Sequence, residues 1–260
     1  MASPAAPAQF IIDSIPGGLA EIPLAPLEQE QPKAYFGQRR LLVTEFARRW
    51  VALVGLPLDL VPGTYVLQLD TADSEALEAR EFTVFPRRRE GSGEADLPGP
   101  PAELNAPDLS WREPLQAGLP LQSPVDLPAK PVFGRHRPAS RTGEARAGRA
   151  DFVAFTVTRD STVRAPQAGT VAALATHKTG VYLWIDHGMS LYTRLGPLSS
   201  AAAAPSATLR PGQPIGRILL DEDETPRELY LAVYLNGTAI NPFLIFELDA
   251  PGDDRLTGGR

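Results

Sequence analysis

Residues 163–195 read VRAPQAGTVAALATHKTGVYLWIDHGMSLYTRL, and this stretch decides the fold of the second half of the chain. β-Branched and aromatic residues alternate in it with small or polar ones, and glycine or proline separates the runs. Residues 163–165, 170–175, 181–186 and 190–195 are therefore predicted to be short strands. The pattern favours a meander of short strands.

Composition limits the class of protein. The chain has 260 residues and 43% hydrophobic content, which suffices for one large or two modest domains with real cores. A net charge of −6 argues against a nucleic-acid partner. Because the chain has no cysteine, neither a disulfide framework nor a thiolate metal site is predicted. The 27 prolines and 22 glycines suit an all-β protein with long linkers better than a helical one.

Segments that cross or enter a membrane are not expected. No apolar run approaches the ~20 residues that span a bilayer. The first residues, MASPAAPAQF, lack the basic segment and apolar core of a signal peptide. The absence of cysteine fits either the cytosol or the periplasm.

The distribution of β-forming and turn-forming residues along the chain predicts two domains. Short β-forming runs separated by turn residues fill residues 9–88 and predict a small, Ig-like β-sandwich. Residues 89–122 are rich in glycine, proline and acidic residues, which indicates a flexible linker. The second domain is expected over residues 123–249. Residues 1–8 and 250–260 are predicted to be a disordered start and a flexible tail.

A series of short motifs follows one another along the second half. They are V-x-A-P-x-x-G-x-V at residues 163–171, Ile185–Gly188, L-Y-x-x-L at residues 191–195, Pro211–Gly216, Leu235–Gly237 and Pro242. In this order they resemble the LytM or lysostaphin-type zinc metallopeptidase domain, and the resemblance covers roughly residues 123–248. It implies an antiparallel β domain of the duplicated hybrid motif type. Residues 49–59 and 62–65 resemble a run that precedes the peptidase domain in such families.

The resemblance implies a zinc site in which a His-x-x-x-Asp pair supplies two ligands. Counting from Phe133-Gly134 places this pair on Ala147 and Asp151. Asp151 keeps the type of residue that the family has there. Ala147 has no donor atom and therefore cannot bind a metal ion.

The remaining family positions also carry other residues here. The catalytic histidine before Leu195 falls on Arg194, and the His-x-His pair, counted back from Leu235–Gly237, falls on Glu228 and Tyr230. Arginine is permanently cationic and repels a divalent ion. Tyrosine, with an unperturbed pKa of about 10, is a poor zinc ligand. Neither zinc nor another cofactor is therefore expected.

The chain has three histidines, which could in principle rebuild a site. His136 lies in a loop beside arginines, His177 lies in the turn THKTG, and His187 stands at a position that is structural in the family. None stands two or four residues from another histidine, so none is predicted to be a ligand.

Four residues, Asp151, Arg194, Glu228 and Tyr230, are expected to point into one groove if the scaffold is kept. Arg194 between two carboxylates would form a charge-assisted network that replaces the metal ion as the cross-link. Alternatively these side chains are simply solvated, and exposed pairs then contribute ~0–1 kcal/mol. The sequence leaves both possibilities open. Trp111, in the second half of the linker, is expected to pack against the second domain.

Three functions compete. The resemblance implies a non-catalytic envelope or periplasmic protein that binds and regulates a peptidoglycan hydrolase, in the manner of amidase activators, or binds peptidoglycan through the groove. The second is an active zinc endopeptidase that cleaves peptidoglycan cross-links with altered ligands. The third is a structural or assembly component of the envelope, with the Ig-like domain as the working part. The missing histidines favour the first.

Overall fold

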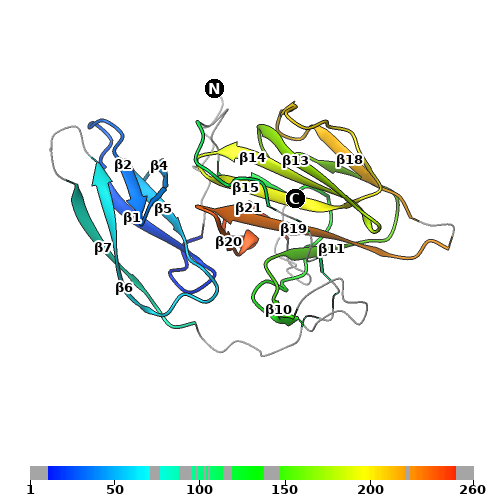
Figure 1. The fold of residues 1–260 in the computed structure, drawn as a ribbon, viewed down its shortest axis with the longest axis horizontal. Helices are drawn as coiled ribbons and strands as arrows, with labels where there is room; N and C mark the ends of the chain where they lie inside the picture. Colours follow the sequence, from blue (N-terminus) through cyan, green and yellow to red (C-terminus); the bar gives the residue numbers. More distant parts are fainter. Residues whose placement is uncertain are drawn as a thin grey trace, which may run out of the picture.

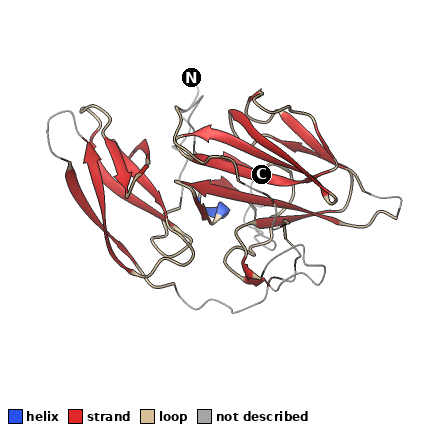
Figure 2. Cartoon of the chain, viewed as in Figure 1, coloured by secondary structure: helices blue, strands red, loops and turns tan. Residues whose placement is uncertain are grey.

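The fold is known from a computed structural model. It describes residues 11–70, 77–87, 95, 97, 99–101, 104, 106–113, 119–137, 147–220 and 223–249. Within these ranges the regular structure is β, apart from one turn of 3-10 helix at Pro242–Leu244 (Figure 2). The predicted all-β class is confirmed. The predicted disordered start and flexible tail lie outside the described residues, and so does much of the predicted linker.

The first domain is built from two antiparallel sheets (Figure 1). One has the order β1-β5-β4, with strands Leu19–Pro26, Arg49–Gly55 and Leu42–Phe46. The other has the order β3-β2-β6-β7, with strands Arg39–Arg40, Lys33–Phe36, Gly63–Asp70 and Glu78–Val84. Side chains of both sheets meet in one buried cluster, which is the core of a sandwich.

Strand β5 shows how the two domains are joined. Ala52 and Val54 pack into the core between the two sheets of the first domain. Val51 and Leu53 point the other way and belong to the core of the second domain. Because both faces of β5 are buried, its sequence RWVALVG is continuously apolar after Arg49 rather than alternating. The two domains therefore share a core.

The second domain contains the main sheet, in the order β11-β19-β15-β14-β13-β17 with β20 beside β19. Its strands are Val153–Val157 (β11), Arg227–Leu235 (β19), Leu191–Leu198 (β15), Gly180–Gly188 (β14), Gly169–His177 (β13), Thr208–Leu209 (β17) and Thr238–Ile240 (β20). Consecutive strands pair as hairpins from β13 to β15, which confirms three of the four strands of the predicted meander. The fourth, predicted at residues 163–165, belongs to a separate sheet.

Smaller pairings complete the domain. A three-stranded sheet has the order β12-β18-β16, with strands Ser161–Arg164, Pro214–Ile218 and Ser200–Ala201. Two further pairs join His136–Arg137 (β9) to Gly148–Arg149 (β10), and Leu121–Gln122 (β8) in parallel to Phe246–Glu247 (β21). In the described part of the chain no helix is long and apolar enough to cross a bilayer.

Strand β19 separates the two faces of the main sheet. Leu229, Leu231 and Val233 are fully buried in the core. Side chains alternate along a strand, so Glu228, Tyr230, Ala232 and Tyr234 lie on the opposite face. We call this the polar face. Two of the four predicted groove residues, Glu228 and Tyr230, lie on this face of β19 itself. Arg194 of β15 reaches the same face because it is paired with Ala232.

Candidate functional site

Arg194 and Asp151 form the centre of the polar face. Asp151 stands two residues before β11, and Arg194 lies in the middle of β15. Nη2 of Arg194 is 3.3 Å from each carboxylate oxygen of Asp151. The Tyr234 hydroxyl donates to Oδ2 of the same carboxylate at 2.7 Å. The Arg194 side chain is 9% exposed and that of Asp151 33%, so the guanidinium is enclosed and the carboxylate reaches solvent.

Aromatic rings enclose the Arg194 guanidinium. Its carbon lies 5.5 Å from the ring centroid of Trp184 and 5.7 Å from that of Tyr234. The centroids of these two rings are 5.0 Å apart. Trp184 lies beside Arg194 because the two residues are paired across β14 and β15. Burial is the largest single influence and disfavours the charged guanidinium, but the charge of Asp151, the hydrogen bond to it and the nearby tyrosines Tyr234 and Tyr182 together outweigh burial and raise the pKa of Arg194. A permanent cation is thus fixed at the position where the sequence resemblance predicted a catalytic histidine in an active enzyme.

Tyr230 packs as an apolar residue. Its ring centroid is 4.9 Å from that of Phe152, inside a buried cluster that includes Ala150 and Ala154. Burial, and then the charge of Glu228, raise the pKa of Tyr230 well above its usual value. The neutral phenol is therefore the stable form, and a neutral phenol does not serve as a zinc ligand.

Residues between the two domains cover the end of the polar face at which Tyr230 lies. Ala95 is buried in the same cluster as Tyr230, and Leu97 and Leu104 pack against it. The Ala95 N–H donates to the carbonyl of His136 at 2.8 Å. A Cβ added at Gly99 would lie 3.0 Å from the Phe152 ring, so the backbone approaches the ring closely there. These described residues of the predicted linker are packed.

Glu228 pairs with Lys130 rather than with Arg194. Oε1 of Glu228 lies 2.8 Å from Nζ of Lys130 and accepts a hydrogen bond from the Thr156 hydroxyl at 3.0 Å. Oε2 is buried and has no hydrogen-bond partner among the residues that the structure describes. Arg194 therefore contacts one carboxylate, that of Asp151, and the expected bridge to a second carboxylate is replaced by a separate ion pair.

The three histidines lie on different strands of the second domain, and Ala147 precedes a further one. Ala147 is exposed just before β10, and His136 is exposed on β9. Nδ1 of His177 contacts the Thr179 hydroxyl at 3.0 Å in the turn after β13. His187 lies on the core side, 2.8 Å from both the Ala168 carbonyl and the Thr193 hydroxyl. Burial lowers the pKa of His187 to about 4, against the opposing effects of the Ala168 hydrogen bond and the Asp186 charge.

The residues present do not fit a zinc ion. Zinc in a hydrolase takes three nitrogen, sulfur or carboxylate ligands from the protein. Of the family's ligand positions only Asp151 keeps a ligand type, and its carboxylate already binds a guanidinium and a phenol. Across the described ranges there is no group of three or more His, Cys, Asp or Glu side chains that could hold a metal ion.

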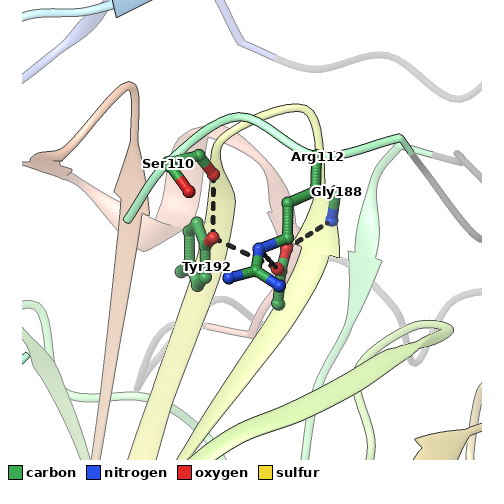
Figure 3. A network of polar contacts seen from close by, with 5 residues as sticks. Ser110, Arg112, Gly188 and Tyr192 are labelled. Carbon is green, nitrogen blue, oxygen red and sulfur yellow. Dashed lines mark hydrogen bonds and ion pairs between the residues drawn. The ribbon is translucent and has the colours of Figure 1, made fainter. Parts of the chain in front are cut away.

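A second polar cluster lies on the same face, at the end where β14 turns into β15 (Figure 3). The Arg112 side chain lies 3.2 Å from the Asp186 carboxylate, which also faces the Tyr192 hydroxyl at 3.1 Å. The Tyr192 hydroxyl contacts the Ser110 carbonyl at 2.8 Å. The sequence motifs contain Asp186 and Tyr192, but we interpreted both as scaffold residues. The sequence feature that could have identified this cluster is a carboxylate, Asp186, two residues before the turn at Gly188.

Two family models match the chain. The model of Peptidase family M23 matches residues 150–242, and that of the Peptidase family M23 N-terminal domain matches residues 13–84. A crystal structure from Pseudomonas aeruginosa, described as peptidase M23, is 22% identical, and the match covers 90% of this chain and 96% of that chain with a TM-score of 0.67. This likeness shows the two-domain fold.

Weaker structural matches also occur. The SpoIIQ–SpoIIIAH pore forming complex contains a chain that is 17% identical, with 55% of this chain and 99% of that chain covered and a TM-score of 0.40. A zinc containing peptidase from Vibrio cholerae is 14% identical, with 72% and 50% covered and a TM-score of 0.35. No curated protein matches the chain.

Proposed function

We propose, from the premise that this chain belongs to Peptidase family M23, that it is a non-catalytic member which acts by binding other molecules. The observation that carries the proposal is the buried ion pair of Arg194 with Asp151. A guanidinium stands where the proton-transferring imidazole is expected, and it holds the remaining carboxylate of the ligand set.

The chemistry of hydrolysis supports this assignment. A zinc peptidase needs three ligands, an open position for water and a group that moves a proton at working pH. Arg194 cannot give up its proton near neutral pH, and the raised pKa of Tyr230 keeps the phenol neutral. Glu228 is held by Lys130. Nothing in this set polarises an amide carbonyl.

The proposed partner is a peptidoglycan hydrolase of the cell envelope, in the manner of an amidase activator, or the peptide of peptidoglycan itself. Of the four predicted groove residues, the proposed contact surface is centred on Asp151, with Arg194 and Glu228 beside it, whereas Tyr230 is buried in the cluster that includes Ala95. In the pair of Arg194 with Asp151, Asp151 is the more accessible residue, with one third of its side chain exposed. Its carboxylate therefore offers acceptor capacity to a partner without breaking the bond to Arg194.

Two experiments test the proposal. Purified protein is incubated with isolated peptidoglycan sacculi, with and without added zinc, and released muropeptides are measured by chromatography. We expect no release above a boiled control. Zinc-dependent release would overturn the non-catalytic assignment.

Binding is tested separately, by co-sedimentation with the same sacculi and by surface plasmon resonance against a purified peptidoglycan amidase. Binding to one of them is expected to weaken in Asp151→Ala. The matched control is Asp126→Ala, because Asp126 is an exposed carboxylate of the same domain outside the polar face. Equal binding by both variants would contradict the proposed contact surface.

A further inference from the structure

The Asp186 carboxylate is a built site for a cation. It lies at the end of β14 with its side chain only 8% exposed. Oδ1 accepts a hydrogen bond from the Gly188 N–H at 2.8 Å, and Oδ2 lies 3.1 Å from the Tyr192 hydroxyl. A buried carboxylate is costly unless it is hydrogen-bonded and paired with a cation. The Arg112 side chain, 63% exposed, supplies that cation from outside the domain.

The same place binds two backbone carbonyls of one extended segment. The Tyr192 hydroxyl lies 2.8 Å from the carbonyl of Ser110, and the Met189 N–H donates to the carbonyl of Arg112 at 2.7 Å. Figure 3 shows the Ser110 and Arg112 side of this contact over the end of the β14–β15 hairpin. The site therefore contacts the carbonyls of Ser110 and Arg112 together with the side chain of Arg112. Backbone contacts of this kind are also made when a strand binds to a sheet edge.

The first domain recognises the residue in between. The Arg40 guanidinium stacks over the Trp111 ring, 3.6 Å from its centroid. The Arg40 carbonyl accepts a hydrogen bond from Nδ2 of Asn236, which fixes Arg40 beside the second domain. The contact of the Trp111 ring with Arg40 adds the first domain to the second-domain contacts of its neighbours Ser110 and Arg112. Both domains therefore contribute to the site.

From these contacts we propose that Asp186, Tyr192, Met189 N–H and Arg40 form a binding site for an extended peptide in which an aromatic residue is followed by a basic one. Residues 110–112, Ser-Trp-Arg, occupy this site within the chain. A segment of the same chemistry in another protein binds there by displacing them. This inference does not depend on whether the chain is catalytic.

The exposure of the occupant explains why it can be exchanged. Ser110 and Arg112 are exposed and Trp111 is half-buried, so the segment is bound by polar contacts and one stacked ring rather than by a large apolar side chain in the core. Tethered segments nevertheless compete strongly, because a short linker gives an effective concentration of the order of millimolar. A free peptide therefore binds the unaltered chain weakly and binds more tightly when the tethered segment is weakened.

The test uses the full chain and a fluorescent peptide with the sequence of residues 106–113, APDLSWRE. The double variant Trp111→Ala/Arg112→Ala frees the site, and binding is followed by fluorescence anisotropy at low salt. We expect the double variant to bind the peptide at least roughly tenfold more tightly than the unaltered chain, which holds its own segment. Arg48→Ala, which removes a fully exposed arginine elsewhere, should bind as weakly as the unaltered chain.

Peptide variants and hydrogen exchange identify the contacts. Replacing arginine by alanine in the peptide should weaken binding by up to about fivefold, because the carboxylate loses its cation. The Met189 amide should exchange faster in the double variant and become protected again when the peptide is added.

Three outcomes would overturn the proposal: a folded double variant that does not bind the peptide, a Met189 amide that stays protected in it, or equal binding of the arginine and alanine peptides. Adding Asp186→Asn to the double variant should abolish binding. Its thermal melting curve separates loss of the site from loss of the fold.

Discussion

The polar face carries two arginine–carboxylate pairs whose burial is opposite. In the pair of Arg194 with Asp151 the guanidinium is buried and the carboxylate is partly exposed. In the pair of Arg112 with Asp186 the carboxylate is buried and the guanidinium is exposed. Each carboxylate also has a tyrosine hydroxyl, from Tyr234 and Tyr192, which face each other across β19 and β15.

What differs is the origin of the arginine. Arg194 belongs to a central strand of the sheet, so its side chain is held in its enclosed position and its removal costs stability. Arg112 belongs to the segment between the domains, and its side chain can leave without disturbing a strand. The same two chemical groups therefore act as a fixed cross-link in one place and as an exchangeable contact in the other.

Removing the fixed arginine should have the largest effect. Arg194→Ala leaves Asp151 and Tyr234 without their cation and removes a packed side chain between two aromatic rings. Breaking a fully buried pair costs about 3–5 kcal/mol, and the partial exposure of Asp151 lowers our expectation to about 2–3 kcal/mol. Urea unfolding followed by circular dichroism measures the loss. A change no larger than that of Arg112→Ala would remove the distinction between the two pairs.

The core side of the same strands should respond to pH. His187 is neutral in the folded protein, with a pKa near 4 against 6.5 for the unfolded chain. The unfolded state therefore binds more protons between these values, so stability is full above pH 6.5 and falls as the pH drops towards 4. We expect a loss of about 2 kcal/mol between pH 7.5 and 5. Both arginines stay protonated in this window, so neither supplies the effect.

Two histidine variants assign that pH effect. His187→Gln should flatten the dependence of the unfolding free energy on pH, whereas His177→Gln, in an exposed turn, should leave it as in the unaltered chain. Urea unfolding at four pH values between 7.5 and 5 measures both. If the unaltered chain shows no slope, His187 does not lie in the environment described.

The smallest effect on stability is expected from the exchangeable arginine. Arg112→Ala should lower the unfolding free energy by less than about 1 kcal/mol, because the guanidinium is largely hydrated in the folded state. The difference from the unaltered chain should shrink further in high salt. Differential scanning calorimetry at low and high salt measures it. A loss as large as that of Arg194→Ala would show that the segment is a fixed part of the fold.

Much of the fold could be predicted because local patterns determine it. Alternation in residues 181–186 and 190–195 predicted two strands of the meander, and the structure extends both by a few residues. Alternation also explains why Glu228 and Tyr230 share a face. The substitution of Arg194 for a histidine was visible in the motif L-Y-x-x-L itself.

The partners of these residues could not be predicted because they come from distant parts of the chain. Lys130 meets Glu228 across 98 positions, and Ser110 meets Tyr192 across 82. The contribution of Tyr234 to Asp151 depends on strand register, which the motifs do not specify. The contact of Trp111 with Arg40 could not be predicted, because no motif places Arg40 at the junction of the domains.

The most direct test of the non-catalytic assignment is the zinc content of the protein after dialysis against buffered zinc, measured by mass spectrometry beside two variants. Ala147→His/Tyr230→His restores a ligand set with Asp151 but keeps the competing guanidinium, and adding Arg194→His removes it. We predict substoichiometric zinc in the unaltered chain, weak binding in the double variant and the highest zinc content in the triple variant. One zinc ion per unaltered chain, retained through dialysis and accompanied by release of muropeptides from sacculi, would contradict the account.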